Sequence, residues 1–439
     1  MLTNYIGIIR TFNRNIILYL VATGILGFAV DGGVNSVIFN LYLLRLGFGP
    51  EFIGQINSAG LTTFALASLP AGALAGRFPA RTLMAIGLGL MLAGCAMLPL
   101  AESLGPANPA PWLFAGFIAI YLGMALYFVP AVPFIFDVTR EDERSPVFSA
   151  QSALLALSAF IGSLIGGFLP TVFANVLGLS LDHPEAYRYT HIVATLLMAP
   201  ALIAILKTRA VQQPEPPLEP QEVPLPVEAT APLQRRWRGI QASAVTLVIL
   251  LSLVRFFQVA GVGSTATFFN VYMDTELGIP TATIGAVTAT ARLIGVPAAL
   301  ITPLLVMRWG ARSTVAFAGI GSALSIVPLV LATGWGMAGV GYMGMIAFSS
   351  MRYPAFLGYS MSKVPARWRG TLSGAGEMAG GLSFAGIALV GGYIIANRGF
   401  NTLFMLGGAL SLFGTFLFWI WFMRPREEIP PPRPVAPKP

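Results

Sequence analysis

The chain has 439 residues, of which 56% are apolar and only 10% are charged. Soluble proteins carry roughly a quarter charged residues, so this composition excludes an ordinary soluble enzyme or binding protein. The net charge of +8 does not indicate a nucleic-acid partner, because the basic residues are spread between long apolar segments instead of forming one patch.

Twelve apolar segments follow one another along the chain, and each is long enough to cross a hydrocarbon core of about 30 Å as a helix. The predicted spans are residues 16–43, 51–76, 82–101, 111–137, 146–176, 186–206, 241–273, 281–307, 313–333, 336–362, 368–397 and 401–423. The sequence therefore predicts an all-α membrane protein with 12 transmembrane helices.

The basic residues are distributed unevenly between the two sides of these spans. Of the 26 Lys and Arg, 20 fall on the side of both termini, whereas only Arg45, Arg188 and Arg398 fall on the other side. Cytoplasmic loops retain Lys and Arg, so we expect both termini in the cytoplasm. We expect the membrane to be the inner (plasma) membrane of a bacterium.

Residues 207–240 interrupt the apolar pattern with seven prolines and four glutamates. A Pro-rich, acidic run cannot pack a core, so it predicts an extended cytoplasmic linker. The expected organisation is a six-helix bundle in residues 1–206, the linker 207–240, a second six-helix bundle in 241–423, and a disordered cytoplasmic tail in 424–439.

One pattern occurs twice, with an offset of 230 or 231 residues. Two similar halves are the architecture of secondary transporters, whose substrate site lies between the halves near the bilayer midplane. A recurring polar position more often serves helix packing than substrate choice, and we expect this of the two asparagines in the pattern. The copies pair Phe39 with Phe269, Asn40 with Asn270, Tyr42 with Tyr272, Arg77 with Arg308 and Arg81 with Arg312.

Twelve spans divided six and six by a cytoplasmic linker resemble the major facilitator superfamily over essentially the whole chain. That family's signature after the second span reads Gly-x-x-x-Asp-Arg-x-Gly-Arg-Arg/Lys. Gly72, Arg77 and Arg81 match it, whereas Gly76 replaces the Asp and Pro79 replaces the second Gly. The resemblance implies two pseudo-symmetric bundles that rock about a central site by alternating access.

The resemblance also implies a cytoplasmic gate that includes Gly72. In the family, an acid at the end of the fourth span meets the Arg of this loop and latches the outward-open state. Asp137 with Arg77 or Arg81 is the matching pair, and a solvated charge run is the alternative. The second copy of the loop adds Arg308 and Arg312 to the predicted gate.

Charged side chains at membrane depth are costly and usually face a cavity or a partner. A carboxylate isolated in a low-dielectric interior favours its protonated form, and a nearby arginine favours the ionised form. Asp31 and Glu377 are therefore the candidates for proton coupling, with a permanent salt bridge to an arginine as the alternative for each. The five charged residues inside the predicted spans are Asp31, Arg255, Arg292, Arg352 and Glu377.

The three interior arginines are candidates for a substrate cavity, because the guanidinium fork suits carboxylate and phosphate groups. The alternative, which we favour, is that Arg352 reaches toward the cytoplasmic interface and only Arg255 and Arg292 are interior. Polar residues complete the candidate cavity: Asn35, on one helical face with Asp31, Gln258, on one face with Arg255, and Gln151.

The fifth predicted span contains the stretch from Gly162 to Gly167, which reads Gly-Ser-Leu-Ile-Gly-Gly. Exporters of the family that antiport protons read Gly-Pro-x-x-Gly-Gly there, so the match is partial, with Ser163 in place of Pro. The partial match favours export, and small-residue helix packing is the alternative.

We expect no cofactor and no metal. His183 and His191 are the only histidines, both placed near a loop opposite the termini, and Cys95 is the only cysteine, so no zinc, haem or iron–sulfur site can be assembled. Without an interior His we find no nucleophile–base constellation of an enzyme. The absence of a GxxxxGK[ST] loop excludes direct drive by ATP.

The sequence therefore favours a proton-coupled exporter of amphiphilic organic compounds, acting as a monomer among membrane lipids. One alternative is an uptake symporter or uniporter for a small polar or anionic solute, which would use the arginines. An alternative of another class is a lipid-flipping protein or another non-transporting membrane protein.

Overall fold

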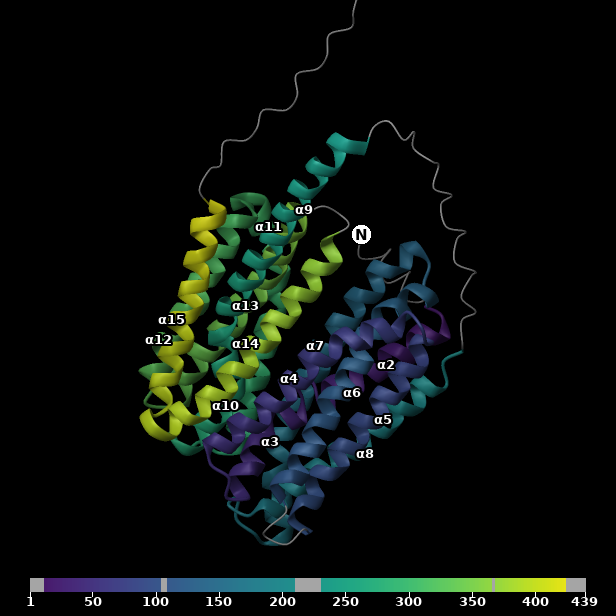
Figure 1. Cartoon of the computed structure of the whole chain (residues 1–439). Coiled ribbons are helices and arrows are strands. Elements are labelled where there is room, and N and C mark those ends of the chain that lie inside the picture. The colour runs from purple at the N-terminus through teal and green to yellow at the C-terminus, as the bar shows by residue number, and fades with distance from the viewer. Residues whose placement is uncertain (1–11, 104–108, 210–229, 365–367, 424–439) are drawn as a thin grey trace, which may run out of the picture.

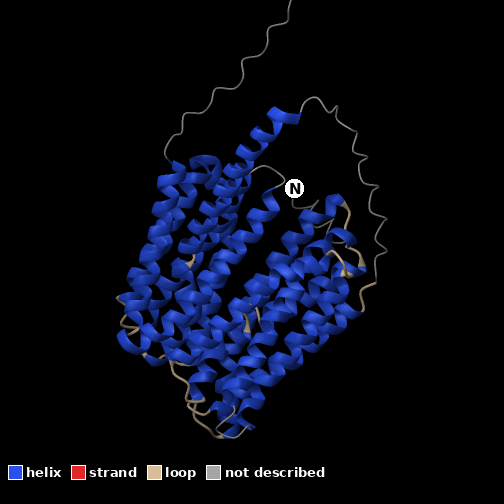
Figure 2. Cartoon of the chain, viewed as in Figure 1, coloured by secondary structure: helices blue, strands red, loops and turns tan. Residues whose placement is uncertain are grey.

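The structure is a computed structural model that describes residues 12–103, 109–209, 230–364 and 368–423. Within these ranges the chain is almost entirely helical and contains no strand (Figure 2). The middle of the predicted linker and the predicted tail 424–439 lie outside the described residues. The helix that follows the linker begins at Thr230, within the segment predicted to be linker.

Local sequence explains several helix ends in the first half. The Asn13 side chain caps α2 by accepting a hydrogen bond from the backbone nitrogen of Ile16 at 3.0 Å. Pro50 and Pro184 stand in the first turns of α4 and α8, where a missing amide hydrogen is harmless. The helices are α2 (Arg14–Ala29), α3 (Val34–Arg45), α4 (Pro50–Ala75), α5 (Ala80–Met97), α6 (Pro109–Val138), α7 (Glu141–Leu177) and α8 (Pro184–Leu206), with a 3-10 turn at Leu98–Ser103.

The second half contains one unusually long helical segment, α11, which is broken inside. Gly310 has φ 81° and ψ 155°, a left-handed φ that glycine adopts without a steric penalty. The helices are α9 (Thr230–Gln258), α10 (Ala260–Thr275), α11 (Thr281–Leu324), α12 (Ile326–Val330), α13 (Trp335–Lys363), α14 (Arg369–Arg398) and α15 (Phe400–Phe418), followed by a π-helical turn at Trp419–Met423.

Ten helical segments in the described part of the chain are long and apolar enough to cross a membrane, against the twelve predicted. Two of the predicted spans fall in one segment, Thr281–Val330, which has 50 residues and contains the break at Gly310. The helix α13, which covers the predicted span 336–362, is not among the ten. The chain is thus an integral membrane protein built from apolar helices.

Figure 1 shows α2–α8 gathered in one group and α9–α15 in another. The two groups meet where α4 lies beside α14 and α7 beside α11. At the second crossing, a Cβ added at Gly167 or at Gly285 would lie 2.6 Å from the Cα of the other residue. Glycine therefore allows α7 and α11 to touch backbone to backbone.

The groups are joined at the end opposite the start of α9, which we call the far end. There Arg45 donates to both carboxylate oxygens of Asp274 at 2.7 and 2.8 Å, and the Tyr187 and Thr281 hydroxyls lie 2.9 Å apart. At the other end, which we call the linker end, α9 and α14 diverge from α4 and α7 (Figure 1). The molecule is therefore closed at the far end and spread at the linker end.

The repeated sequence pattern makes the same contacts in each half. Asn40 Nδ2 donates to the Thr267 carbonyl at 2.7 Å, and Asn270 Nδ2 donates to the Val37 carbonyl at 3.2 Å. The other amide atom is occupied as well, because Asn57 donates to Asn40 Oδ1 at 2.9 Å and Thr288 donates to Asn270 Oδ1 at 3.2 Å. Each asparagine thus fastens its helix to the backbone of the equivalent helix in the other half.

Candidate functional site

The helix predicted over residues 16–43 is broken in its middle. α2 ends at Ala29 and α3 begins at Val34, so that Asp31 and Gly32 stand in a short non-helical turn. Gly32 has a φ of 84°. Ser36 Oγ accepts from the Gly32 nitrogen at 2.9 Å, and Ser163 Oγ donates to the Gly32 carbonyl at 2.6 Å. This break was not predicted, although two consecutive glycines follow Asp31 in the sequence.

Ser163 therefore has a definite contact in this fold. A Cβ added at the neighbouring Gly162 would lie 2.2 Å from the Phe28 carbonyl oxygen, so α7 and α2 are in backbone contact there. Gly166 approaches Val34 in the same way, at 2.7 Å from its Cα. The packing interpretation of this stretch accounts for these contacts without reference to export.

A second break interrupts the first helix of the second half, between α9 and α10 at Val259. Side chains bind the backbone at this break as well. Arg352 Nη1 donates to the Gln258 carbonyl at 2.5 Å, and Ser411 Oγ donates to the same oxygen at 3.0 Å. Ser411 Oγ also accepts from the Gly261 nitrogen at 3.0 Å, so side chains close this break from both sides.

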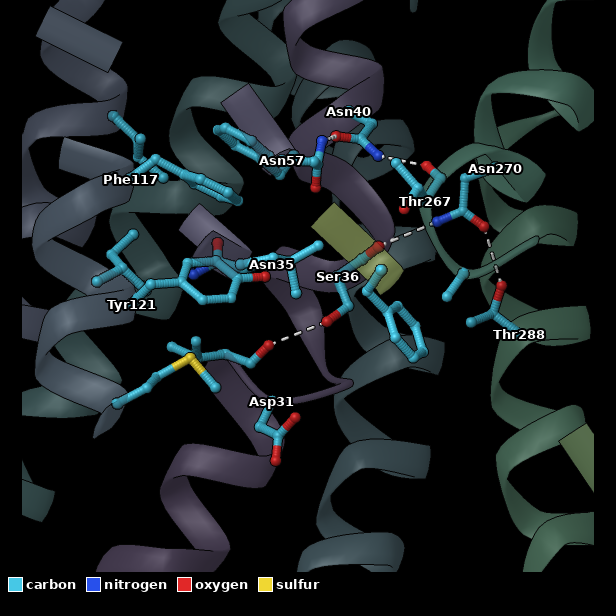
Figure 3. Close-up of a pocket in the computed structure, with 18 of the residues that line it drawn as sticks. Asp31, Asn35, Ser36, Asn40, Asn57, Phe117, Tyr121, Thr267, Asn270 and Thr288 are labelled. Atoms are coloured by element: carbon cyan, nitrogen blue, oxygen red, sulfur yellow. Dashed lines mark hydrogen bonds between the residues drawn. The ribbon is translucent and has the colours of Figure 1, made fainter. Parts of the chain in front are cut away.

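A cavity of about 280 Å³ lies where the two halves meet, next to the first break. Figure 3 shows that its wall is rich in amide and hydroxyl groups, with Asn40 and Asn270 on one side and Asp31 at the turn. Aromatic rings complete it. Its lining includes Asp31, Asn35, Ser36, Phe39, Asn40, Asn57, Phe117, Tyr121, Thr267, Asn270, Thr288, Arg292, Tyr342 and Phe384.

A larger cavity, of about 1170 Å³, lies between α7 and α11. Its lining is mostly apolar, with Phe148 and several alanines from α7 and Val296 and Leu300 from α11. Asp31 and Arg292 line this cavity as well as the smaller one. The two charges therefore stand at the boundary between a polar compartment and an apolar one.

Asp31 and Arg292 face each other across the two halves without bonding directly. A Cβ added at Gly32 would lie 2.4 Å from the guanidinium carbon of Arg292, so this group packs on the broken turn. It is close enough to attract the Asp31 carboxylate. None of the ion pairs found among the described residues joins the two, and Arg292 Nε is buried without a hydrogen-bond partner.

Glu377, the second proton-coupling candidate, belongs to a separate cluster on the second half. Its carboxylate accepts from Arg255 Nη2 at 2.7 Å and from the Tyr353 hydroxyl at 3.0 Å. The Arg255 guanidinium also lies over the Tyr353 ring, 4.9 Å from its centroid. The Glu377 side chain is 52% exposed, so this salt bridge borders open space, whereas Arg255 is nearly buried. The salt-bridge alternative for Glu377 thus describes the present state.

The expectation that Arg352 reaches toward the cytoplasmic interface is wrong. Arg352 is only 3% exposed, and its guanidinium holds the break at Gln258. The physical reason is that the carbonyl end of a helix carries partial negative charge, so the Gln258 carbonyl at the end of α9 attracts a cation. Gln258 is also buried, and neither residue lines the cavities described above.

The expectation that the chain has no interior histidine is wrong. His191 lies inside α8 and is 1% exposed, with Nδ1 2.8 Å from Asn35 Oδ1 and its ring against those of Phe39 and Tyr42. Asn35 Nδ2 in turn lies 3.5 Å from Cys95 Sγ. Asn35 thus lines the small cavity while being held from behind. The available sequence signal was the position of His191 inside the predicted span 186–206.

The remaining predicted residues lie away from the small cavity. Gln151 is on α7 but is not among the residues that line either cavity. Arg77, Arg81 and Asp137 surround a third cavity, of about 400 Å³, at the linker end. No ion pair between Asp137 and either arginine is found in the described part of the chain, and Arg81 instead donates to the Leu206 carbonyl.

The second copy of the predicted gate is arranged differently. Arg312 lies over the Tyr359 ring, 5.8 Å from its centroid, and Arg308 is exposed. Gly310 between them carries the break in α11. Gly72, on α4, is exposed and has only Val129 near the position of a Cβ, at 3.8 Å.

The family model described as Major Facilitator Superfamily matches residues 20–388 of this chain. Among similar solved structures, a crystal structure of a D-xylose-proton symporter has a TM-score of 0.69 at 14% sequence identity, covering 94% of this chain and 97% of that one.

Two further solved structures are similar over nearly their whole length. The nucleoside transporter NupG has a TM-score of 0.66 at 15% identity, with 93% of this chain and 100% of that chain covered. An auto-inhibited POT family peptide transporter has a TM-score of 0.71 at 14% identity, with 94% and 98% covered. Identities this low show the fold alone. A comparison with curated proteins found no match.

Proposed function

Because the chain belongs to the major facilitator superfamily, we propose that it is a secondary active transporter that exports amphiphilic organic compounds in exchange for protons, by alternating access. The observation that carries this proposal is the pair of cavities that share Asp31 and Arg292. A polar compartment beside an apolar one suits a substrate with a charged or polar group and a hydrocarbon part.

The proposed topology has twelve crossings in two pseudo-symmetric six-helix bundles, residues 1–206 and 241–423, with the linker 207–240 and the tail 424–439 in the cytoplasm. A straight helix of the 50 residues in Thr281–Val330 would be roughly 75 Å long, more than twice a hydrocarbon core. The break at Gly310 divides it into two crossings. α13, with 29 residues, supplies another crossing.

The linker end is then the cytoplasmic end, and the protein is open toward the cytoplasm. The Arg45–Asp274 ion pair closes the opposite side. The positive-inside distribution of Lys and Arg supports this orientation, with both termini in the cytoplasm and the bacterial inner membrane as the location. We propose that the protein acts as a monomer.

Asp31 is the proposed site of proton exchange. Its carboxylate lines both cavities and takes part in none of the ion pairs found among the described residues. A proton on Asp31 removes the negative charge that a cationic group of the substrate would pair with. Proton and substrate therefore compete for one carboxylate, which couples their movements in opposite directions. Arg292 orients anionic or hydrogen-bond-accepting groups beside it.

Glu377 is the second proposed proton site, nearer the cytoplasmic mouth. In the present state Arg255 and Tyr353 donate to it while half of its surface is open. Rocking of the halves brings α14 closer to α4 at this end, and the environment of Glu377 changes with it. The gate formed by Gly72, Arg77, Arg81 and Asp137, together with Arg308 and Arg312, would hold the closed arrangement of the same end.

A second candidate function is uptake of a small polar or anionic solute. It is favoured by the size of the polar cavity, about 280 Å³, which is smaller than the pockets of roughly 300–1,000 Å³ that hold drug-sized ligands. Its amide-rich wall suits a hydroxylated or charged small molecule. In this version the cavity between α7 and α11 is only the path to the cytoplasm.

Transport by the purified protein in proteoliposomes tests both candidates. Rhodamine 6G, 1-anilinonaphthalene-8-sulfonate and a fluorescent lysophosphatidylcholine represent cationic, anionic and zwitterionic amphiphiles, and labelled lactate and alanine represent small solutes. We expect an imposed proton gradient to drive at least one amphiphile and to reverse its movement when the gradient is reversed. Movement of lactate or alanine alone would establish the second candidate, and movement of none of the five would overturn the proposal.

A further inference from the structure

We propose that the cavity between α7 and α11 is a lateral groove that holds the hydrocarbon chain of a single-chain zwitterionic amphiphile. The chain points toward the lipid, and the headgroup occupies the Asp31–Arg292 site. This inference rests on the proposed transport function and names its substrate class. The substrate is then taken from the cytoplasmic leaflet of the membrane and not from water.

The lining of the groove includes two charged residues at the centre of the molecule and several exposed residues. Asp31 and Arg292 form the inner end. Leu300 of α11, which also lines it, is 72% exposed, and Ala153 and Ser149 of α7 are exposed as well. The walls between are mostly alanine and other apolar side chains. A hydrocarbon chain in this groove meets the same kind of surface that it meets in lipid.

The groove is closed toward the far end. Gly167 and Gly285 bring α7 and α11 into backbone contact there. All of the α7 residues in its lining, from Phe148 to Ala159, precede that contact and lie nearer the linker end. An amphiphile in the groove therefore enters at the level of one leaflet, the one on the side of the linker.

The two charges at the inner end select the headgroup. Asp31 and Arg292 attract each other without forming an ion pair within bonding distance, and Arg292 Nε has no partner. Neither of these side chains has another counter-charge among the residues lining the two cavities. An ammonium beside Asp31 and a phosphate or carboxylate beside Arg292 satisfy both, whereas a singly charged headgroup leaves one of them uncompensated.

The volume of the site agrees with a single-chain occupant. The polar cavity of about 280 Å³ holds a headgroup, and the groove of about 1170 Å³ exceeds what a drug-sized molecule needs. The polar cavity also has its own hydrogen-bonding wall, including Asn35, which His191 holds in place. Tyr121 and Tyr342, which carry hydroxyl groups, also line this cavity, and a headgroup with ester or hydroxyl oxygens can accept hydrogen bonds from such groups.

Photo-crosslinking tests where the chain lies. The full-length protein in nanodiscs is labelled with lysophosphatidylcholine that carries a diazirine in its acyl chain, and labelled peptides are identified by mass spectrometry. We expect labels in residues 148–159 and 292–300. Ala153→Trp should fill the groove and reduce this labelling about tenfold. Leu157→Trp, on the same helix but outside the groove lining, is the matched control and should label like the unmodified protein.

Binding measurements test the headgroup. Anisotropy with fluorescent lysophosphatidylcholine, lysophosphatidylglycerol and an alkylamine compares zwitterion, anion and cation on the same chain length. We expect the zwitterion to bind about tenfold more tightly than either, and Arg292→Gln and Asp31→Asn to remove that preference. Each variant is first checked for a monodisperse peak and an unchanged thermal midpoint, so that loss of binding is not loss of fold.

The outcomes separate this inference from the function on which it rests. Equal binding of all three headgroups overturns the zwitterionic site. Labels outside α7 and α11, or labelling unaffected by Ala153→Trp, overturn the proposed position of the hydrocarbon chain in the groove. Proton-driven transport of amphiphiles in proteoliposomes would in that case still support the proposed function. Absence of that transport overturns the proposed function itself.

Discussion

In both halves the first membrane helix is interrupted at an equivalent place, after Ala29 in the first half and at Val259 in the second. In the second half, Arg352 and Ser411 reach across and satisfy the freed carbonyl of Gln258. In the first half, Ser36 and Ser163 bind the nitrogen and the carbonyl of Gly32, and Asp31 beside this turn faces two cavities.

The same interruption of the first helix is therefore structural in the second half and borders the candidate site in the first half. An interrupted helix exposes amide and carbonyl groups that need partners in a low-dielectric interior. At both breaks, side chains of the same half supply these partners. Only the first break also places a carboxylate, Asp31, at the two cavities beside Arg292 of the other half, so only this break can bind a ligand and respond to movement between the halves.

The largest difference between the two breaks should appear in transport. Asp31→Asn keeps the shape of the side chain and removes its charge, so we expect proton-driven exchange in proteoliposomes to fall about 100-fold, the size of a strong coupling between two ligands. Thermal unfolding of the variant should match that of the unmodified protein. Exchange at the original rate and with the original pH dependence would remove Asp31 from the mechanism.

The two arginines should separate stability from function. Arg352→Ala leaves the Gln258 carbonyl short of a donor and opens a cavity in the core, so we expect a loss of about 3 kcal/mol in stability. Arg292→Ala, whose side chain lines cavities, should cost less than about 1 kcal/mol and yet weaken substrate binding. The measurement is thermal unfolding in detergent for both variants. Equal stability losses would show that the two breaks do not differ as described.

Asn40 and Asn270 make equivalent contacts in the two halves. Asn40→Ala and Asn270→Ala each remove a buried side-chain bond to the backbone of the other half, and each should cost about 1 kcal/mol. Because the contacts are equivalent, we expect the two losses in thermal stability to be similar. A loss of thermal stability in only one variant would mean that only one of the two asparagines holds the halves together.

The smallest effect concerns the proposed latch at the linker end. Asp137 lines one cavity with Arg77 and Arg81 but forms no ion pair with them that is found in the described ranges of this open state. Asp137→Asn should therefore stabilise the state open at the linker end by less than about 1 kcal/mol, because the lost pair would be solvent-exposed. Spin-label distances between the linker ends of α4 and α14 report this shift. An unaltered distribution, with Asp137→Glu as the control, would exclude the latch.

The proposed proton site on the second half, Glu377, gives a further comparison. Glu377→Gln removes the acceptor charge beside Arg255 at the mouth, where half of the carboxylate surface is open. We expect the pH profile of transport to change while stability stays within about 1 kcal/mol, as is usual for exposed ion pairs. A pH profile that coincides with that of the unmodified protein leaves Asp31 as the single proton site.

Composition and hydropathy were enough to predict the class of protein and where most helices lie. Hydropathy sums the free energies of transfer of neighbouring residues from water to lipid. It is therefore a local property that does not depend on the fold. The repeat showed which positions of the two halves correspond. The positions of Asp31 and Arg292 inside apolar spans predicted that both charges lie at membrane depth. The family resemblance is confirmed by the match over residues 20–388.

The contacts of those charged residues depend on how the helices pack. Asp31 and Arg292 are 261 residues apart in the chain, and Arg352 and Gln258 are 94 apart, so their contacts depend on the rotation and tilt of whole helices. Hydropathy records that a side chain is costly in lipid but not which neighbour relieves the cost. For that reason the buried position of Arg352, the contact of His191 with Asn35 and the groove between α7 and α11 could not be predicted from the order of residues.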